Sequence, residues 1–441
     1  MKRITVDNFR CFSHLEVDFR KKVNLLIGDN AAGKTSMLKA CKYALSAWFS
    51  GFSDENTRWQ TFNEIDFRII EHDSFRLPDE PIRIHFDVDD VYDSVSMSEL
   101  WGMKRPGMQY IGRNSRKNSR SMQAGITNLR LYTSLLYFNY ASKGNGQVYP
   151  LPLFASFSTE DIHSKRKIKQ KSFMVQNQKA SFGYYECLSA YGLFKYWLKR
   201  MLVLEETGER QQELQSVSDA IVKALGSDGC NIISAVHVYP NLKDVYYEFV
   251  DGRKISSEKL SDGYRRLVNI VTDIAFRCYL LNGALYGAEA IKKTRGTVLI
   301  DEIDMHLHPT LQAKVAKALS DTFEGLQFII TSHAPMVMSS VKTDDDNTVY
   351  HLAYKAEEGY TLQTISTYGQ DISTIIRRNL GVAPRVAEIQ EKIDALNRLI
   401  DDEDVENARI KLEELKAEFA DSLPELISAE ANIRFLIDDL D

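Results

Sequence analysis

The sequence predicts an α/β protein: a mixed sheet with flanking helices, interrupted by a large insertion and followed by a C-terminal helical region. Three observations predict this fold. A continuous apolar run at residues 23–27, typical of a buried strand, leads into a glycine-rich turn and then a helical pattern. Residues 297–300 and 327–331 repeat the buried-strand pattern, with a helical pattern at 311–319 between them. Beyond residue 384 the apolar positions take helical spacing only.

The chain has 441 residues, a length that predicts more than one domain. Alternating apolar residues before residue 20 predict two strands that begin the fold as a hairpin. We expect residues 1–50 and 240–380 to form the core. We expect residues 51–239 to form an insertion and helical lobe, and residues 384–441 to form an acidic helical tail.

The composition is that of an ordinary globular protein, with 44% hydrophobic and 26% charged residues. This excludes a disordered chain, a collagen-like repeat and a disulfide-rich miniprotein. The five cysteines are scattered without C-x-x-C spacing, which favours reduced thiols and excludes a zinc cage built from them. There is no signal-peptide pattern and no run of about 18 uncharged apolar residues. We therefore expect a cytoplasmic protein with no membrane partner.

Charge is unevenly distributed along the chain, whose formal net charge is −6. Residues 384–441 hold 17 acidic and 7 basic residues, a net charge of −10. Residues 101–130 hold seven basic residues and residues 163–179 hold six, and neither segment contains an acid. These two segments are either solvated basic loops or contacts for nucleic acid. Interleaved aromatic residues at Trp101 and Phe173 favour nucleic acid.

The acidic tail shows two runs of apolar residues spaced three and four apart, at 386–400 and 405–419. This spacing predicts two amphipathic helices, with a short further helix beginning at Pro424. The apolar stripe either packs on the tail itself or on the body of the protein, or forms an oligomerisation surface.

The strongest local motif is Gly28-x4-Gly33-Lys34-Thr35, placed between a predicted strand and a predicted helix. Glycines let backbone N–H groups surround phosphate oxygens, and the helix N-terminus adds a positive dipole end. Lys34 is predicted to reach the β- and γ-phosphates, and the Thr35 hydroxyl to bind Mg²⁺. The motif therefore predicts ATP and Mg²⁺ as cofactors.

A second motif completes this site. The apolar run 298–300 ends in Asp301 and Glu302. A strand that ends here would deliver Asp301 to the Mg²⁺ ion, and would place Glu302 to orient and deprotonate the attacking water. Two acids at a strand end would alone be weak evidence, but they accompany a phosphate-binding loop.

A third motif, Leu260-Ser261-Asp262-Gly263, opens a predicted helix, where Ser261 could act as its N-cap. Together with Asp301-Glu302 and with His333 after the next strand, it resembles the ATP-binding-cassette class. That resemblance implies that Ser261 and Gly263 of one subunit close over the γ-phosphate held by another, and that His333 contacts the same phosphate. The nucleotide-contact candidates are Arg10, Gly28, Asn30, Gly33, Lys34, Thr35, Ser36, Ser261 and Gly263.

Within this class, Asn8-Phe9-Arg10 and residues 303–309 resemble the RecF/SMC/OLD branch, which acts on DNA. The resemblance identifies Asp304 as a subunit-contacting residue and disfavours a metal site formed with His306 and His308. Residues 153–160 occupy the place of a Q-loop but contain no glutamine. Nothing beyond Pro335 has the pattern of a nuclease site, so we expect none in this chain.

Residues 184–188, residues 368–371 and the helical tail resemble the PtuA family, the ATPases of Septu antiphage systems and of Septu-type retrons. The resemblance implies an HNH nuclease partner of the PtuB type. It also implies a homo-oligomer built on an ATP-sandwich dimer and, in the retron version, a reverse transcriptase with its DNA–RNA. The alternatives are a RecF- or SMC-like DNA-repair ATPase without a nuclease partner and an ABC transporter ATPase subunit.

Overall fold

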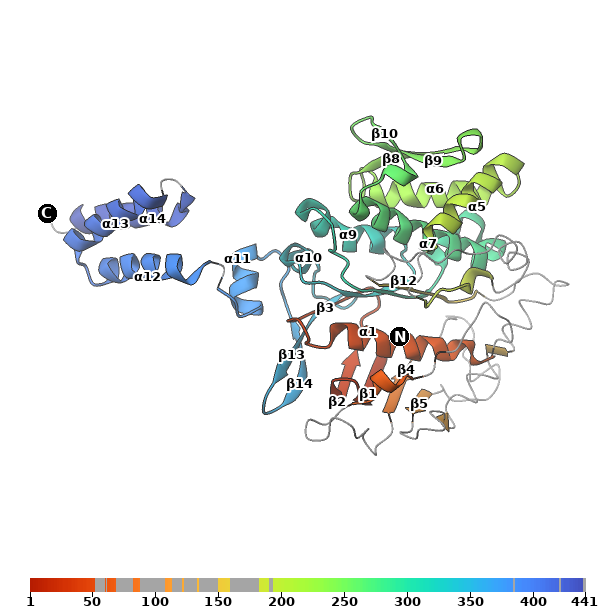
Figure 1. Cartoon of the computed structure of the whole chain (residues 1–441), viewed down its shortest axis with the longest axis horizontal. Helices are drawn as coiled ribbons and strands as arrows, with labels where there is room; N and C mark the ends of the chain where they lie inside the picture. Colours follow the sequence, from red (N-terminus) through yellow and green to blue (C-terminus); the bar gives the residue numbers. More distant parts are fainter. Residues whose placement is uncertain are drawn as a thin grey trace. The chain divides into compact units, whose positions relative to one another are not determined.

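The computed structural model divides into two compact units, Met1–Ile375 and Ile376–Asp441 (Figure 1). The described residues are 1–51, 60, 62–68, 82–87, 108–112, 121–122, 133–134, 150–158, 182–189, 193–383, 385–419 and 422–438.

A six-stranded sheet forms the centre of the first unit, in the order β14-β13-β3-β12-β11-β7. The five strands from β13 to β7 run parallel, and only β14 is antiparallel to its neighbour. Strands β3 and β12 are buried along their whole length, as expected for a parallel sheet covered on both faces. The strands are β3 (Val23–Ile27), β7 (Leu153–Phe157), β11 (Gly296–Ile300), β12 (Leu326–Thr331), β13 (Thr348–Lys355) and β14 (Gly359–Ile365).

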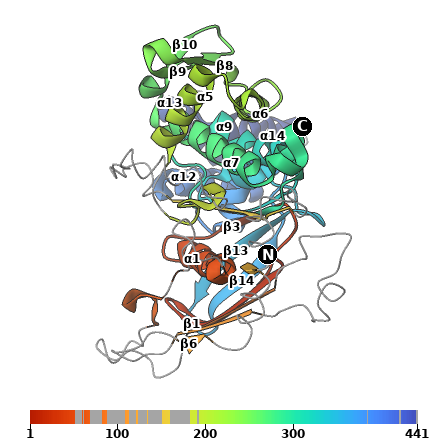
Figure 2. The same ribbon diagram turned by 90° about the vertical axis from the view of Figure 1, so that its right-hand side faces the viewer.

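Helices cover both faces of this sheet, and the views in Figures 1 and 2 show the layers. Helix α1 (Lys34–Ser46) contacts β11 and β12 on one face. On the other face lie α7 (Asp262–Tyr286), which contacts β7, and α9 (Pro309–Thr322), which contacts β12. The short helix α10 (Pro335–Ser340) packs on α9.

A five-stranded antiparallel sheet in the order β2-β1-β4-β5-β6 lies on the far side of α1, which contacts β1 and β4. The predicted N-terminal hairpin is confirmed by β1 and β2, whose register pairs Val6 with Leu15. Helix α1 is therefore held between two sheets. The strands are β1 (Arg3–Phe9), β2 (Phe12–Asp18), β4 (Ile82–Asp87), β5 (Met108–Gly112) and β6 (Ser121–Met122).

A further lobe packs on α7 and consists of α5 (Phe194–Thr207), α6 (Gln211–Leu225) and a small antiparallel sheet in the order β10-β9-β8. Its strands are β8 (Ile233–Tyr239), β9 (Asp244–Phe249) and β10 (Lys254–Ser256). The remaining short helices are η1 (Ala47–Gly51), η2 (Glu64–Asp66), η4 (Phe182–Tyr184), η5 (Pro240–Leu242), η6 (Ser257–Lys259), η7 (Gly287–Glu289), α8 (Ala290–Lys293), α11 (Ile372–Thr374) and η8 (Ile375–Asn379).

A buried ion pair on α7 takes part in the contact with this lobe. Arg277 on α7 pairs with Asp273 one turn earlier, at 2.6 Å, and donates to the backbone carbonyls of Gly183 and Tyr185. Asp273 also accepts a hydrogen bond from the indole of Trp197 on α5, at 2.6 Å. A buried charge is tolerated only when such partners are present.

The second unit contains three helices that share one apolar core: α12 (Ala387–Asp401), α13 (Val405–Phe419) and α14 (Pro424–Asp438). The helices predicted from the two apolar runs, and the further helix at Pro424, are confirmed. Ile393 and Leu396 of α12 pack with Leu412 and Leu415 of α13 in this core. The apolar stripe was expected either to pack within the protein or to form an oligomerisation surface. Its central residues pack inside the unit.

The α/β fold with a mixed sheet and a C-terminal helical region is confirmed. Strands β4 and β7, however, come from the expected insertion at 51–239, and they pair with β1 and β11 of the core. The basic segment 163–179, and the charged residues of 101–130, lie outside the described residues. In the described ranges, no helix is both long enough and apolar enough to cross a bilayer.

Candidate nucleotide-binding site

The phosphate-binding loop leaves β3 at Gly28 and enters α1 at Lys34. Gly28 has φ +148° and Gly33 has φ +94°, values that favour glycine. A Cβ atom on Gly28 would lie 2.1 Å from the carbonyl oxygen of Leu352, and one on Gly33 would lie 2.7 Å from the ring of Phe12. Both glycines are therefore required by backbone conformation and by close packing.

Lys34 is buried, and its Nζ donates hydrogen bonds of 2.8 Å to the carbonyl oxygens of Gly28 and Asp29. Burial lowers the pKa of Lys34, and the nearby carboxylates Asp301, Asp29 and Glu302 oppose this shift. The ammonium group is thus held against the loop, where a phosphate oxygen could replace a carbonyl as its partner.

A chain of hydrogen bonds connects the loop to the end of β11. The Thr35 hydroxyl lies 3.0 Å and 3.3 Å from the two carboxylate oxygens of Asp301. The Thr331 hydroxyl, at the end of β12, donates to Asp301 at 2.6 Å and accepts the backbone N–H of Glu302 at 2.7 Å. The register of β3, β12 and β11 explains this grouping, because parallel strands end at the same edge of the sheet.

The oxygen donors at this edge fit Mg²⁺. Mg²⁺ is usually bound by one or two protein oxygens together with substrate phosphates and water. The Thr35 hydroxyl and the Asp301 carboxylate supply such a pair beside the phosphate-binding loop. In the described part of the chain, no three His, Cys, Asp or Glu side chains, Asp304, His306 and His308 included, come together in a group that could hold a metal ion.

Glu302 has φ +48°, in the left-handed region that non-glycine residues seldom occupy. This conformation ends the strand, and the chain is held there by hydrogen bonds from the N–H groups of Glu302 and Ile303 to Thr331. The Glu302 side chain is half-buried next to Asp301. Its position suits a base that acts on a water molecule near the ion.

The Leu260–Gly263 motif precedes and opens helix α7. Ser261 stands at the N-cap position, but its hydroxyl makes no capping hydrogen bond and is exposed, so the prediction that it caps the helix is wrong. A Cβ atom on Gly263 would lie 2.3 Å from the backbone oxygen of His306. The buried guanidinium of Arg266 donates to the backbone oxygen of Asp301. The start of α7 is therefore fixed to the segment that follows β11.

His333 and Asp304 lie on the segments that follow β12 and β11. His333 is half-buried, just beyond the end of β12, and β12 lies between β3 and β11. Asp304 has a buried carboxylate oxygen, Oδ1, with no hydrogen-bond partner among the residues that the structure describes.

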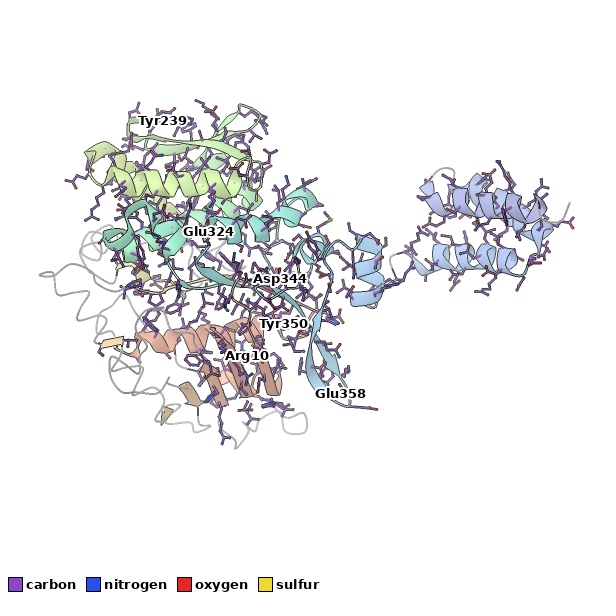
Figure 3. The ribbon with its side chains drawn as sticks, turned by 180° about the vertical axis from the view of Figure 1, so that it is seen from behind. Arg10, Tyr239, Glu324, Asp344, Tyr350 and Glu358 are labelled. Carbon is purple, nitrogen blue, oxygen red and sulfur yellow. The ribbon has the colours of Figure 1, made fainter. Side chains whose placement is uncertain are left out.

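Arg10, at the turn between β1 and β2, is labelled in Figure 3. Its guanidinium pairs with the fully buried carboxylate of Asp66 at 2.9 Å, although the sequence predicts a nucleotide contact. Asp66 also binds Lys39 at 3.1 Å and the hydroxyl of Tyr43, both on α1. Burial alone would raise the pKa of Asp66, but hydrogen bonds from Tyr43, Asn63, Arg10 and Lys39 outweigh burial and lower it.

No sequence motif assigns a role to Asp66, Arg266 or Thr331. Arg266 and Thr331 each lie beside a recognised motif, and this position in the sequence could have indicated that they belong to the site. Asp66 had none, because its partners Arg10 and Tyr43 are distant in the sequence.

Two protein-family models match the chain. One, described as an AAA domain, matches residues 3–219, and the other, described as an AAA domain, putative AbiEii toxin, Type IV TA system, matches residues 153–339. Among solved structures, the SMC head bound to the C-winged helix domain of ScpA aligns with a TM-score of 0.46 and 14% identity, covering 83% of this chain and 97% of that one.

Curated relatives match over differing lengths. The Retron Ec83 probable ATPase of Escherichia coli is 23% identical over 78% of this chain and 70% of its own length. The Septu protein PtuA of Bacillus mycoides is 24% identical over 83% of this chain and 42% of its own length. The Retron Vc95 probable ATPase of Vibrio cholerae is 39% identical over 24% of this chain and 20% of its own length. The chain thus spans less than half the length of two of these three relatives, and its sequence is similar to Septu PtuA and to the retron ATPases.

Proposed function

We propose that the chain binds and hydrolyses ATP. The observation that carries this proposal is the hydrogen-bonded chain from Thr35 through Asp301 and Thr331 to Glu302, beside the buried ammonium of Lys34. A glycine-rich turn alone could serve packing. A loop that also contacts an acidic strand end has the oxygen donors and the base that phosphoryl transfer needs.

In the proposed reaction, the loop N–H groups and Lys34 bind the β- and γ-phosphates. Mg²⁺, when bound through Thr35 and Asp301, neutralises phosphate charge. Glu302 accepts a proton from a water molecule as the water oxygen bonds to the γ-phosphorus and the bond to the ADP oxygen breaks. His333 contacts the γ-phosphate from the next strand end.

We further propose that two copies enclose each ATP. The exposed Ser261 hydroxyl is not used for capping, so it can donate to a phosphate held by another subunit. The N-terminus of the long helix α7 adds a favourable dipole for an anion. The unpartnered oxygen of Asp304 lies on the segment that Gly263 touches at His306, and both belong to the same proposed contact region.

The relatives support a role in antiphage defence. We propose that nucleotide-driven closure controls an HNH nuclease partner of the PtuB type and nucleic acid bound by residues 101–130 and 163–179. A retron reverse transcriptase with its DNA–RNA would join in the retron version. A RecF-like repair ATPase is the alternative, and the neighbouring genes discriminate between them, because an adjacent HNH reading frame accompanies only the defence system.

The tail is the proposed surface for protein partners. Because Ile393, Leu396, Leu412 and Leu415 are internal, the available apolar surface is a different one. Ile427 and Phe435 of α14 are 69% and 67% exposed, and with exposed Ala431 they follow an i, i+4, i+8 stripe. We call these three residues the α14 stripe. The tail's net charge of −10 favours a basic protein partner over nucleic acid.

The test is ATP binding and phosphate release by the whole chain. Lys34→Ala should reduce ATP affinity at least about tenfold, because the ammonium contacts the phosphates directly. Lys317→Ala is the matched control, since Lys317 is 75% exposed on α9 and pairs only with the nearby Asp321 among described residues. Unchanged binding by the Lys34 variant would contradict the proposed function.

A further inference from the structure

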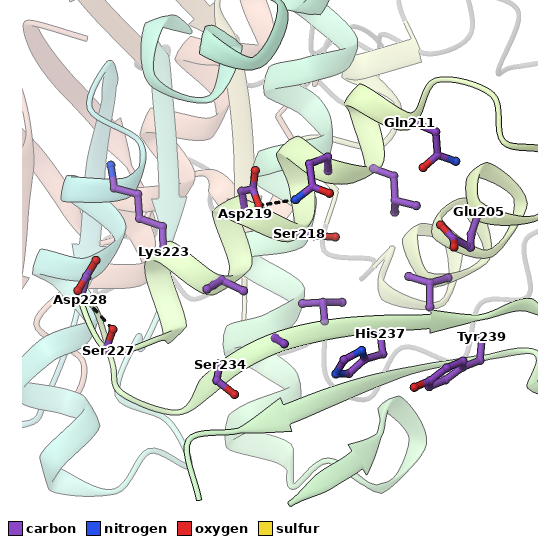
Figure 4. A pocket seen from close by; sticks show the side chains of 16 residues that line it. Glu205, Gln211, Ser218, Asp219, Lys223, Ser227, Asp228, Ser234, His237 and Tyr239 are labelled. Atoms are coloured by element: carbon purple, nitrogen blue, oxygen red, sulfur yellow. Dashed lines mark hydrogen bonds between the residues drawn. The ribbon is translucent and has the colours of Figure 1, made fainter. Parts of the chain in front are cut away.

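A groove of about 690 Å³ lies in the lobe that packs on α7, away from the nucleotide site (Figure 4). It runs between helix α6 and strand β8, with Glu205 of α5 at one end and Asp228 at the other. No residue of the nucleotide site contributes to it.

The edge of strand β8 faces this groove. Six consecutive residues, 234–239, line it. Successive side chains of a strand point to opposite faces, so a space lined by every residue must lie along the strand's edge, where backbone N–H and C=O groups project. In the described part of the chain, β8 is the outer strand of its sheet and pairs with β9 alone. Such an edge can accept another strand.

The side chains around this edge give the groove negative charge. Glu205, Asp219 and Asp228 line it, and Figure 4 shows Asp219 accepting a hydrogen bond from the neutral side chain of Gln215. The two basic residues in the lining are already paired with acids outside it: Lys223 with Glu324 at 3.3 Å, and His237 with Glu248 at 2.7 Å. Three carboxylates therefore remain to attract a positive ligand.

The groove also has an apolar component, formed by Leu214 and Val222 of α6 and by Val236 and Val238 of β8. Its length along β8 and the outer position of that strand in its sheet suit an extended chain. The carboxylates would repel the phosphates of a nucleic acid.

We propose that this groove binds an extended segment of a partner polypeptide, which adds as a strand to the edge of β8. Backbone hydrogen bonds supply the register. Basic side chains at alternate positions of the segment meet the carboxylates, while the residues between them contact the apolar surface. This interaction is separate from the nucleotide site and does not depend on hydrolysis.

The probe is a labelled heptapeptide of alternating lysine and valine, and its binding to the whole chain is measured by fluorescence anisotropy. Asp219→Lys combined with Asp228→Lys should weaken binding at least about tenfold, because it reverses the charge of two of three carboxylates. Asp321→Lys is the matched control: Asp321 is an exposed aspartate on α9 outside the groove, and this variant should change binding less than about twofold.

Strand addition also predicts which backbone N–H groups of the peptide take part in binding. Only alternate residues of an added strand direct their N–H groups to the edge. Two versions of the peptide, N-methylated at odd or at even positions, should therefore differ, with one losing binding and the other retaining it. Equal binding by the two versions would overturn strand addition, and equal binding by the charge-reversed protein would overturn the assignment of the groove.

Discussion

Glu302 is the residue on which the proposed hydrolysis depends most directly. Glu302→Gln should retain ATP binding and lower the hydrolysis rate at least about a hundredfold, because glutamine can orient water but cannot accept its proton. Phosphate release and nucleotide affinity, measured on the same preparation, check this. The isosteric change leaves the backbone hydrogen bond to Thr331 in place. Hydrolysis at the wild-type rate would show that another group is the base.

Asp66 is the residue that holds the turn at Arg10 to helix α1. Asp66→Asn should lower the free energy of unfolding by about 3 kcal/mol, because two cations lose a buried carboxylate. Urea denaturation at pH 7 measures the loss.

The stabilisation provided by Asp66 should depend on pH in a definite direction. The pKa of Asp66 is lowered in the folded state, so its contribution is complete above its unfolded pKa of about 4 and disappears as the pH falls through the folded value. The difference in stability between wild type and Asp66→Asn should therefore narrow below about pH 4. A difference that widens in acid would contradict the assignment.

At the scale of elements, the start of α7 depends on one close approach. Gly263→Ala would place a Cβ atom 2.3 Å from the His306 oxygen, and both groups belong to backbone that is fixed by neighbours. We expect this variant to shift the Ser261 segment and to lower hydrolysis more than ATP binding. Gly252→Ala is the control, because Gly252 has open space around it and its own positive φ of +86° adds backbone strain without a close contact. Equal effects of the two variants would show that the contact with His306 is unimportant.

Two double variants of the tail, one in its core and one on its surface, distinguish internal packing from partner binding. Leu412→Ser with Leu415→Ser should unfold the three-helix unit, because each change removes a large buried side chain. Ile427→Ser with Phe435→Ser should keep its helicity but release a partner or reduce the assembly size. Circular dichroism and light scattering, with and without co-expressed nuclease, separate the two effects.

Asn432→Ser, an exposed polar change on the same helix, is the control for the tail. An unchanged mass and an unchanged partner complex for the Ile427 and Phe435 variant would show that the α14 stripe is not an interface.

Much of this core was predictable because its signals are local. The buried runs ending at Ile27 and Ile300 and the glycines around Lys34 fix where two strands end, and parallel pairing then brings those ends together. The position of β7 was not predictable. Its apolar run is short and lies within the expected insertion, and only tertiary pairing with β11 reveals it as a core strand.

Contacts of single side chains with distant residues were equally unpredictable from the sequence. The cap at Ser261 was expected from residue type alone, but the structure leaves its hydroxyl exposed. The Arg10 side chain pairs with Asp66, which lies 56 positions away in the sequence. Likewise, the spacing of Leu412 and Leu415 predicts an apolar stripe without showing what covers it, and in the structure both α12 and α14 pack on it.

At the scale of the whole molecule, the proposed functions belong to separate surfaces. The sheet edge would bind nucleotide, the exposed Ser261 would contact a second copy, and the acidic tail and the β8 groove would bind proteins. Closure around ATP is the event that would connect them, since a ligand shifts a conformational equilibrium only by binding one state better. The proposed closure requires that each ATP contacts two chains.

The most direct test of that requirement is the mass of the Glu302→Gln chain by light scattering, with and without ATP and Mg²⁺. We expect an ATP-dependent doubling of the mass of the associating unit. Adding Ser261→Arg should prevent doubling while ATP still binds, and adding Lys34→Ala should prevent both. Mixing these two variants restores one intact interface per pair, so ATP-dependent association should return. A Glu302→Gln chain that binds ATP without any increase in mass, or a mixture that fails to associate, would contradict the shared site.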